Sequence, residues 1–114
     1  MTSTSLLPSS IVAIHSPADI ASALSASVER GGLLLDETHF SAEFFDLSSG
    51  LARQVLQKFT NFRARLAIVV VDPAAYGGGF GELVHEQRNH PAVRFFSSEQ
   101  PARRWLAYNQ IVKC

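Results

Sequence analysis

The chain has 114 residues, with ten basic and ten acidic side chains, so it carries no net formal charge at pH 7. Zero net charge argues against a protein built to coat nucleic acid or anionic lipid, and no apolar run approaches the ~20 residues of a membrane-spanning helix. With 46% hydrophobic residues, a chain of this length can bury one core without metals or disulfides. We expect a flexible polar leader over residues 1–9 and a single domain over residues 10–114.

Two features favour a cytoplasmic location. The single cysteine, Cys114, cannot form an internal disulfide, which suits a reducing compartment. Residues 1–10 lack the basic start and the long apolar middle of a secretory signal.

The first third of the chain predicts two strands with a helix between them. Residues 11–14 (IVAI) are a short apolar run and form the first expected strand. Residues 16–19 (SPAD) supply a serine N-cap, a proline in the first turn and an acid three residues after the cap, and the glycine pair at 31–32 ends the helix. The second expected strand is the leucine run at 33–35. The inward face of the helix is expected to contain Ile20, Leu24 and Val28.

Residues 44–71 organise the expected core. A helix should run from the Ser-Ser-Gly turn at 48–50 to about residue 61, because apolar residues recur there at steps of three and four. These apolar positions are Leu51, Ala52, Val55, Leu56 and Phe59, and the opposite face holds Arg53, Gln54, Gln57 and Lys58. The run LAIVVV at 66–71 contains no polar residue, which is typical of a parallel strand covered on both faces.

The last third continues the alternation of strands and helices. Asp72 and Pro73 end the third strand, since proline cannot donate to a strand ladder, and a glycine-rich loop at 77–81 leads into a helix. Residues 92–97 form the fourth expected strand, and a last helix follows Ser98. The order β-α-β-α-β-α-β-α predicts a single-domain α/β fold with a four-stranded, mainly parallel sheet and helices packed on it.

Two stretches resemble known families. Residues 45–51 (FDLSSGL) resemble the Asp-Ser-Ser-Gly-Leu turn of STAS domains, the anti-sigma-factor antagonist family, and the helix, apolar strand and proline loop follow in the order of that family. Over about residues 10–108 the chain resembles more specifically a small bacterial family known as domain of unknown function 4180, above all in FFDL at 44–47 and LQKFTN at 56–61. The first resemblance implies a STAS-like fold, and the second implies no activity.

The STAS resemblance implies a bacterial regulatory module that binds proteins and has no catalytic activity. Aligned on Gly50, the regulatory serine of the family falls on Ser48, where a phosphate would repel a docked partner. The alternative is that Ser48 or Ser49 merely caps the following helix. The expected partner is another protein or a second copy of this chain. The expected regulatory or partner-binding residues are Ser48, Ser49, Arg53, Gln54 and Gln57.

The ends of the predicted strands suggest a different kind of site. His15, Asp36 and Asp72 each follow a predicted parallel strand, and open α/β sheets bind ligands along that edge. A second hypothesis is therefore a small-molecule site, and a third is a small enzyme that uses acid–base chemistry there. The candidate residues for both are His15, Asp36, His39 and Asp72.

No cofactor and no metal are expected. His85 and His90 flank Glu86 but lie five residues apart, about 140° around a helix, whereas the zinc-peptidase motif needs a spacing of four. The glycines at 77–81 are not followed by Gly-Lys-Ser/Thr and do not have the G-x-G-x-x-G spacing.

A modest strip of basic residues lies on and after the central helix. It contains Arg53, Lys58, Arg63 and Arg65, and it is too sparse in charge and aromatic residues for a nucleic-acid site. The simplest explanation of this strip is a solvent-exposed helix face. The functional alternative is that the strip forms the rim of a binding surface for an acidic protein partner.

Overall fold

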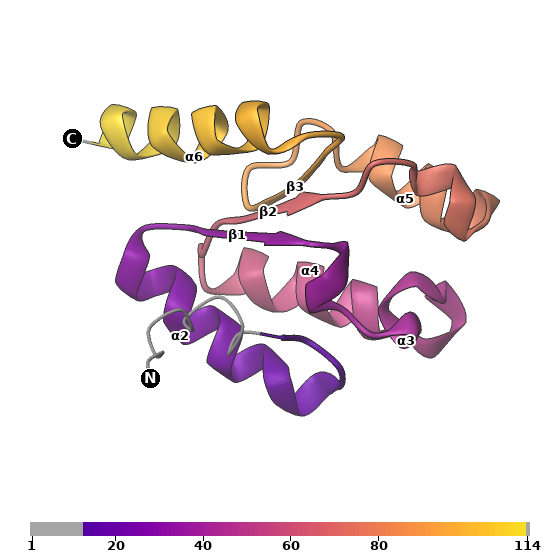
Figure 1. Cartoon of the computed structure of the whole chain (residues 1–114). Coiled ribbons are helices and arrows are strands. Elements are labelled where there is room, and N and C mark those ends of the chain that lie inside the picture. The colour runs from indigo at the N-terminus through magenta and orange to yellow at the C-terminus, as the bar shows by residue number, and fades with distance from the viewer. Residues whose placement is uncertain (1–12, 114) are drawn as a thin grey trace, which may run out of the picture.

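Three parallel strands form the sheet in the computed structural model, which describes residues 13–113, with side chains as far as residue 107 (Figure 1). The strands are β1 (Leu33–Asp36), β2 (Leu66–Val69) and β3 (Val93–Phe96), in the order β1-β2-β3. Their ends are flush: the first residues of the three strands pair with one another, and so do the last. The prediction of an α/β chain with a parallel sheet is therefore confirmed for the residues described.

Helices cover both faces of this sheet. α2 (Ile20–Arg30) and α4 (Leu51–Asn61) lie on one face, and α6 (Glu99–Lys113) lies on the other (Figure 1). The shorter helices α3 (Ala42–Phe45) and α5 (Gly78–Glu86) lie toward the carboxyl ends of the strands. Short 3-10 turns connect these elements, namely η1 (Pro17–Asp19), η2 (Glu37–His39), η3 (Leu47–Ser49) and η4 (Pro73–Tyr76).

The central strand β2 explains the unbroken apolar run in the sequence. Leu66, Ala67 and Ile68 are fully buried, because β2 has a strand on either side and helices above and below. The expected covering of both faces is thus confirmed. The strand is shorter than expected, since it ends at Val69, and Val71 is 70% exposed in the loop that follows.

The first expected strand, at residues 11–14, is not confirmed, so the described sheet has three strands and not the four expected. Ile14, the last residue of the predicted strand at 11–14, forms an isolated parallel bridge with Phe40 instead of a ladder with β1. The reason is that β1 ends at Asp36 and the chain turns through η2, so the segment after the turn is what meets Ile14. Positions 11 and 12, like the expected leader at 1–9, lie outside the described residues.

Both ends of the α2 segment follow the predicted signals. The Asp19 carboxylate accepts the backbone N–H groups of His15 (2.9 Å) and Ser16 (3.2 Å), which completes a capping box. Gly31 ends the helix in the left-handed conformation, with φ 75°.

The inward face of α2 differs from the predicted one. Val28 was expected in the core but is 66% exposed. The buried stripe runs through Ile20, Ala23 and Ser27 instead. Ser27 can take this place because its hydroxyl donates a hydrogen bond to the Arg65 carbonyl (2.7 Å), which satisfies a polar group that burial would otherwise penalise.

The two faces of α4 are confirmed. The buried residues are Leu51, Ala52, Val55 and Phe59, and the exposed ones include Arg53, Gln54, Gln57 and Lys58. The helix begins after Gly50, whose φ of 82° suits glycine, and not directly after a serine N-cap. Ser49 still accepts the Leu51 N–H (3.2 Å), so one serine assists the start of the helix as the capping alternative expected.

α4 ends with an arginine where glycine is usual. The Ala64 N–H donates to the Phe59 carbonyl (3.0 Å) and the Arg63 N–H to the Thr60 carbonyl (3.1 Å), the two hydrogen bonds of a Schellman motif. The motif places Arg63 at φ 55°. For a residue with a Cβ this conformation costs roughly 1–2 kcal/mol. Arg63 is the one non-glycine residue with positive φ in the part of the chain described.

A cluster of aromatic rings joins α3, η4 and α5 to the sheet. Phe80 is at its centre and is 1% exposed. Its ring centroid lies between 5.2 and 6.0 Å from those of Phe44, Phe45, Tyr76 and Phe95. Phe45 also stacks on Tyr76, with centroids 3.9 Å apart. The cluster fixes the elements that surround the carboxyl ends of the strands.

Candidate functional site

The turn after β1 brings together two of the residues expected in a ligand site. Asp36 Oδ1 accepts hydrogen bonds from the Thr38 N–H (2.9 Å) and the Thr38 hydroxyl (2.5 Å). His39 Nδ1 lies 3.0 Å from the same oxygen. The Asp36 side chain is 53% exposed and that of His39 is 17% exposed, so the pair lies at the surface.

The pKa of Asp36 lies below its ordinary value of 3.8. Burial by itself would raise the pKa, but the hydrogen bonds from Thr38 and His39 to the carboxylate outweigh it. Because the pKa is lower in the folded state than in the unfolded state, the carboxylate stabilises the fold at pH values above its unfolded pKa. This contribution is lost as the pH falls through the folded-state pKa.

We therefore expect Asp36→Ala to lower the free energy of unfolding by about 1 kcal/mol at pH 7, the typical cost of losing an N-cap. The gap between wild type and variant should begin to narrow as the pH falls below the ordinary pKa of 3.8, and it should narrow further as the pH passes through the lower folded-state pKa. Urea denaturation of both proteins at pH 7 and pH 3 measures this gap. A gap of equal size at the two pH values would contradict the role given to the ionised carboxylate.

Glu37 was not among the residues predicted from the sequence, although its side chain joins three segments of the chain by hydrogen bonds. One carboxylate oxygen accepts the Val71 N–H (2.9 Å), and the other accepts the hydroxyl of Tyr76. The hydrogen bond to Glu37, together with burial, raises the pKa of Tyr76 above its ordinary value of 10.0. Glu37 thereby ties η2 to the end of β2 and to η4. An acid placed directly after a buried strand was the available signal.

The other two candidates for a ligand site lie apart from this turn. His15 is exposed, and its carbonyl accepts the Ser41 hydroxyl (3.1 Å). Asp72 is exposed and precedes η4 without capping it. Within residues 13–107 no hydrogen bond or ion pair links either side chain to Asp36 or His39, and no group of three His, Cys, Asp or Glu residues could hold a metal ion. Of the four candidate residues, only Asp36 and His39 are therefore in contact with each other.

The turn at 46–49 is shaped by its own hydroxyl groups. Asp46 Oδ1 accepts both the N–H (3.1 Å) and the hydroxyl (2.6 Å) of Ser48, and these bonds lower the pKa of the Asp46 carboxyl. The Ser49 hydroxyl donates to the Glu43 carbonyl (2.7 Å). Both serines are nevertheless exposed, so the turn presents them to solvent.

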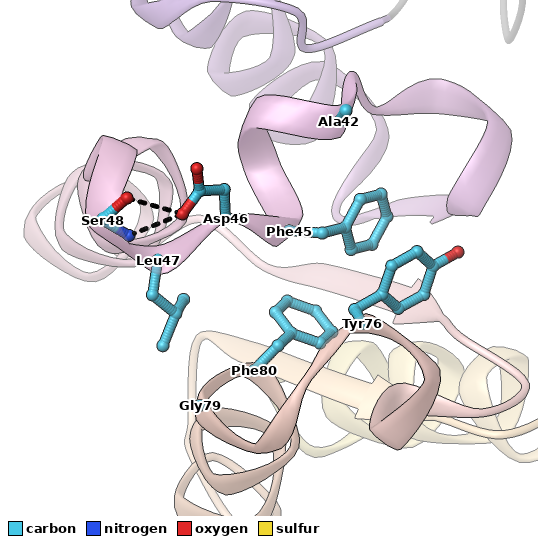
Figure 2. A pocket seen from close by; sticks show the side chains of 8 residues that line it. All are labelled: Ala42, Phe45, Asp46, Leu47, Ser48, Tyr76, Gly79 and Phe80. Atoms are coloured by element: carbon cyan, nitrogen blue, oxygen red, sulfur yellow. Dashed lines mark hydrogen bonds between the residues drawn. The ribbon is translucent and has the colours of Figure 1, made fainter.

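An open hollow of about 430 Å³ lies beside Ser48 (Figure 2). Its inner wall is aromatic and its outer rim carries the Asp46–Ser48 hydrogen bonds. Leu47 points toward α5, where a Cβ on Gly79 would lie 3.4 Å from Leu47 Cδ1. The lining residues are Ala42, Phe45, Asp46, Leu47, Ser48, Tyr76, Gly79 and Phe80. Ser48 therefore lies at the rim of an open surface and not inside a closed pocket.

The exposed face of α4 borders a second hollow, of about 250 Å³. Arg53 and Gln57 line it from α4, and Gln87 and His90 line it from the segment after α5. Gln87 Oε1 is buried and has no hydrogen-bond partner among the described residues. Of the five expected partner-binding residues, all are exposed, but Ser48 lies at one hollow and Arg53 and Gln57 at the other.

His90 has a structural role at this second hollow. Its Nδ1 accepts the backbone N–H groups of Ala92 (3.0 Å) and Val93 (3.2 Å) at the start of β3. Burial and the positive charge of Arg94 lower the pKa of His90, which favours the neutral ring that can accept these bonds.

The fold and the candidate residues define a small α/β protein whose polar candidates lie on open surfaces around a parallel sheet. The chain belongs to the family described as domain of unknown function (DUF4180), whose profile matches residues 4–106. The more specific of the two resemblances is thus confirmed. No curated protein and no solved structure shows a significant match to the chain. Across the described residues, no helix combines the length and the apolar character needed to cross a membrane.

Proposed function

We propose that this chain is a non-enzymatic, cytoplasmic regulatory module that binds another protein through the exposed face of α4 and the neighbouring turn at 46–49. The observation that carries the proposal is the openness of both surfaces. A small-molecule site should enclose its ligand, whereas a protein-binding surface is shallow and open to solvent. The hollow beside Ser48 and the hollow beside Arg53 and Gln57 are both of the second kind.

The contrast between the faces of α4 supports this proposal. The inner face packs into the core through Val55 and Phe59, each 0% exposed. The other presents Arg53, Gln54 and Gln57, and within residues 13–107 none of these three side chains forms a hydrogen bond or ion pair. A helix fixed by its buried face loses little backbone freedom on binding, and donors and acceptors without internal partners need not break an existing bond to contact another protein.

The alternative small-molecule site at the strand ends has weaker support. Asp36 and His39 are in contact, but their polar atoms are largely occupied by the turn itself. His15 and Asp72 line none of the hollows described here. The enzyme hypothesis depends on the same four residues and is weakened for the same reason.

We retain the STAS-like relationship as part of the proposal, without phosphorylation of Ser48. The order of the 46–49 turn, α4, β2, Pro73, β3 and α6 agrees with that resemblance. A phosphate on Ser48 would add roughly −1.5 to −2 charges next to the Asp46 carboxylate, which already accepts the serine hydroxyl. Repulsion between like charges would oppose that modification.

Site-specific photo-crosslinking in the native cell tests the proposed surface. A photo-reactive phenylalanine analogue placed at Gln57 should yield a discrete adduct with a partner, and Arg53→Glu in the same chain should abolish it. The matched control places the analogue at Arg104, which is exposed on α6 across the sheet (Figure 1). An adduct of twice the mass of the chain would identify the partner as a second copy.

Two results would count against the proposal. One is an adduct pattern that is the same at positions 57 and 104. The other is no adduct at 57 together with a metabolite that raises the melting temperature of wild type but not of Asp36→Ala, which would favour the small-molecule alternative.

A further inference from the structure

Three neighbouring hollows with shared lining residues lie along and beyond α4. The hollow beside Arg53 and Gln57 shares Thr60 with a second hollow of about 360 Å³. This second hollow shares Arg63 and Arg65 with a third, of about 430 Å³, which lies between the ends of α2 and α4. We call the three together the arginine groove, after Arg53, Arg63 and Arg65, which line it.

The arginine groove carries positive charge without nearby negative charge in its described lining. It contains three arginines, while no aspartate or glutamate of the described residues lines any of its hollows. The chain as a whole has no net charge, so this excess is local to the groove. A groove lined with positive charge attracts a negatively charged partner and orients it during approach.

The side chains of these three arginines form no hydrogen bond or ion pair with other residues in the range 13–107. Nε of Arg65 is buried and lacks a hydrogen-bond partner. Neither Arg53 nor Arg63 donates a side-chain hydrogen bond or forms an ion pair with a described residue. A buried donor without an acceptor destabilises the fold. Arg53 and Arg63 are exposed, so a carboxylate that entered the groove could accept charge-assisted hydrogen bonds from their guanidinium groups.

The backbone at Arg63 gives an independent argument. Its left-handed conformation disfavours any side chain, and glycine would fit the end of α4 better. The two backbone hydrogen bonds of the Schellman motif offset this strain, but the Arg63 guanidinium adds no hydrogen bond or ion pair with the described residues. Because glycine would form the same motif without strain, the arginine is a reason to look for an external use of the side chain.

Apolar side chains mark one end of the groove. Val28 is 66% exposed and Phe62 is 62% exposed, and both line the third hollow together with Arg63. Exposed apolar residues that border the same hollow provide an anchor point for an apolar side chain of a partner.

We infer that the arginine groove binds an acidic segment of a partner protein that carries an apolar side chain at one end. A row of three neighbouring hollows suits an extended polypeptide better than a compact metabolite, which needs a single enclosing cavity. The inference rests on the proposed function and names the chemistry of the partner. A nucleic acid would match the charge, but it would leave Val28 without a counterpart.

Selection from a phage-displayed library of random 12-residue peptides against the full chain tests this inference. Enriched peptides should combine aspartate or glutamate with a large apolar residue. Their affinity, measured by fluorescence anisotropy, should fall about tenfold in Arg63→Gly, since a charge-assisted hydrogen bond is lost. Affinity should also fall as salt is raised from 50 to 300 mM.

Arg63→Gly is suited to this test because it removes the guanidinium and relieves the strained backbone at once. Its melting temperature should not fall, so a loss of affinity cannot be attributed to unfolding. Arg104→Ala, which removes an exposed arginine outside the groove, should leave the affinity unchanged.

The inference is overturned if the enriched peptides show no acidic bias, or if they bind Arg63→Gly as well as wild type. It is also overturned if labelled oligouridylate binds in an Arg63-dependent way while acidic peptides do not. The crosslinking experiment at Gln57 does not depend on the charge of the partner. A protein adduct at Gln57 together with any of these results would therefore overturn the acidic-segment inference and leave the proposed function standing.

Discussion

Replacing Phe59 with alanine should lower the free energy of unfolding by about 3–5 kcal/mol, the usual range for a buried ring replaced by a methyl group. Phe59 is 0% exposed on the inner face of α4. The loss combines the transfer of the ring from water with a cavity that the surrounding core can only partly close. Small domains have a total stability of roughly 5–15 kcal/mol, so this single change should remove a large part of it.

Gln57→Ala is the matched control for this prediction. It lies on the same helix, is exposed, and replaces one good helix former with another, so we expect a change within about 0.5 kcal/mol. Urea denaturation of both variants, followed by circular dichroism, provides the comparison. Equal effects at the two positions would contradict the assignment of inner and outer faces to α4.

Phe80→Ala should be similarly severe, at about 3–5 kcal/mol, but for a partly different reason. Its ring contacts four other aromatic rings edge-on, and such pairs contribute roughly 0.5–1.5 kcal/mol each beyond the area that they bury. The substitution should therefore loosen α5 from the carboxyl end of the sheet and widen the hollow beside Ser48, which Phe80 lines.

Phe62→Ala makes the same chemical change at an exposed position. Because the Phe62 ring is 62% exposed, we expect a stability loss below about 1 kcal/mol. Thermal unfolding of the two variants side by side, with near-ultraviolet circular dichroism to report on the aromatic cluster, measures the contrast. A loss at Phe62 as large as that at Phe80 would contradict the exposed placement of the Phe62 ring.

Much of the fold could be predicted because its signals are local. The repeat of Leu51, Val55 and Phe59 identified the inner face of α4, and the capping residues marked both ends of α2. The all-apolar run at 66–71 identified a strand covered on both faces, although the strand itself ends at Val69.

The misjudged positions share one physical cause. Val28 falls on the expected helical repeat and Val71 in the expected strand, yet both are exposed, because burial also depends on where an element and its neighbours end. The position of Ile14 depended likewise on how the chain turns after β1, and no local pattern encodes that turn.

The candidate site was less accessible to sequence reasoning than the fold. Asp36 and His39 could be paired because they are three residues apart. The bond between Glu37 and Tyr76 joins residues 39 positions apart, and the arginine groove depends on segments brought together from α2, α4 and the loop before β3. Contacts of this kind follow from the packing of distant segments and produce no periodic pattern in the sequence.

The strand order has a consequence for how the protein is made. Each strand pairs with the one that precedes it in the chain, and no strand must be inserted between two others already in place. As the polypeptide leaves the ribosome, β1, α4 and β2 can dock before β3 has been synthesised, and the sheet can then grow from one side. During that interval the edge of β2 that later receives β3 stays open, and the nascent chain is most exposed to wrong pairing there.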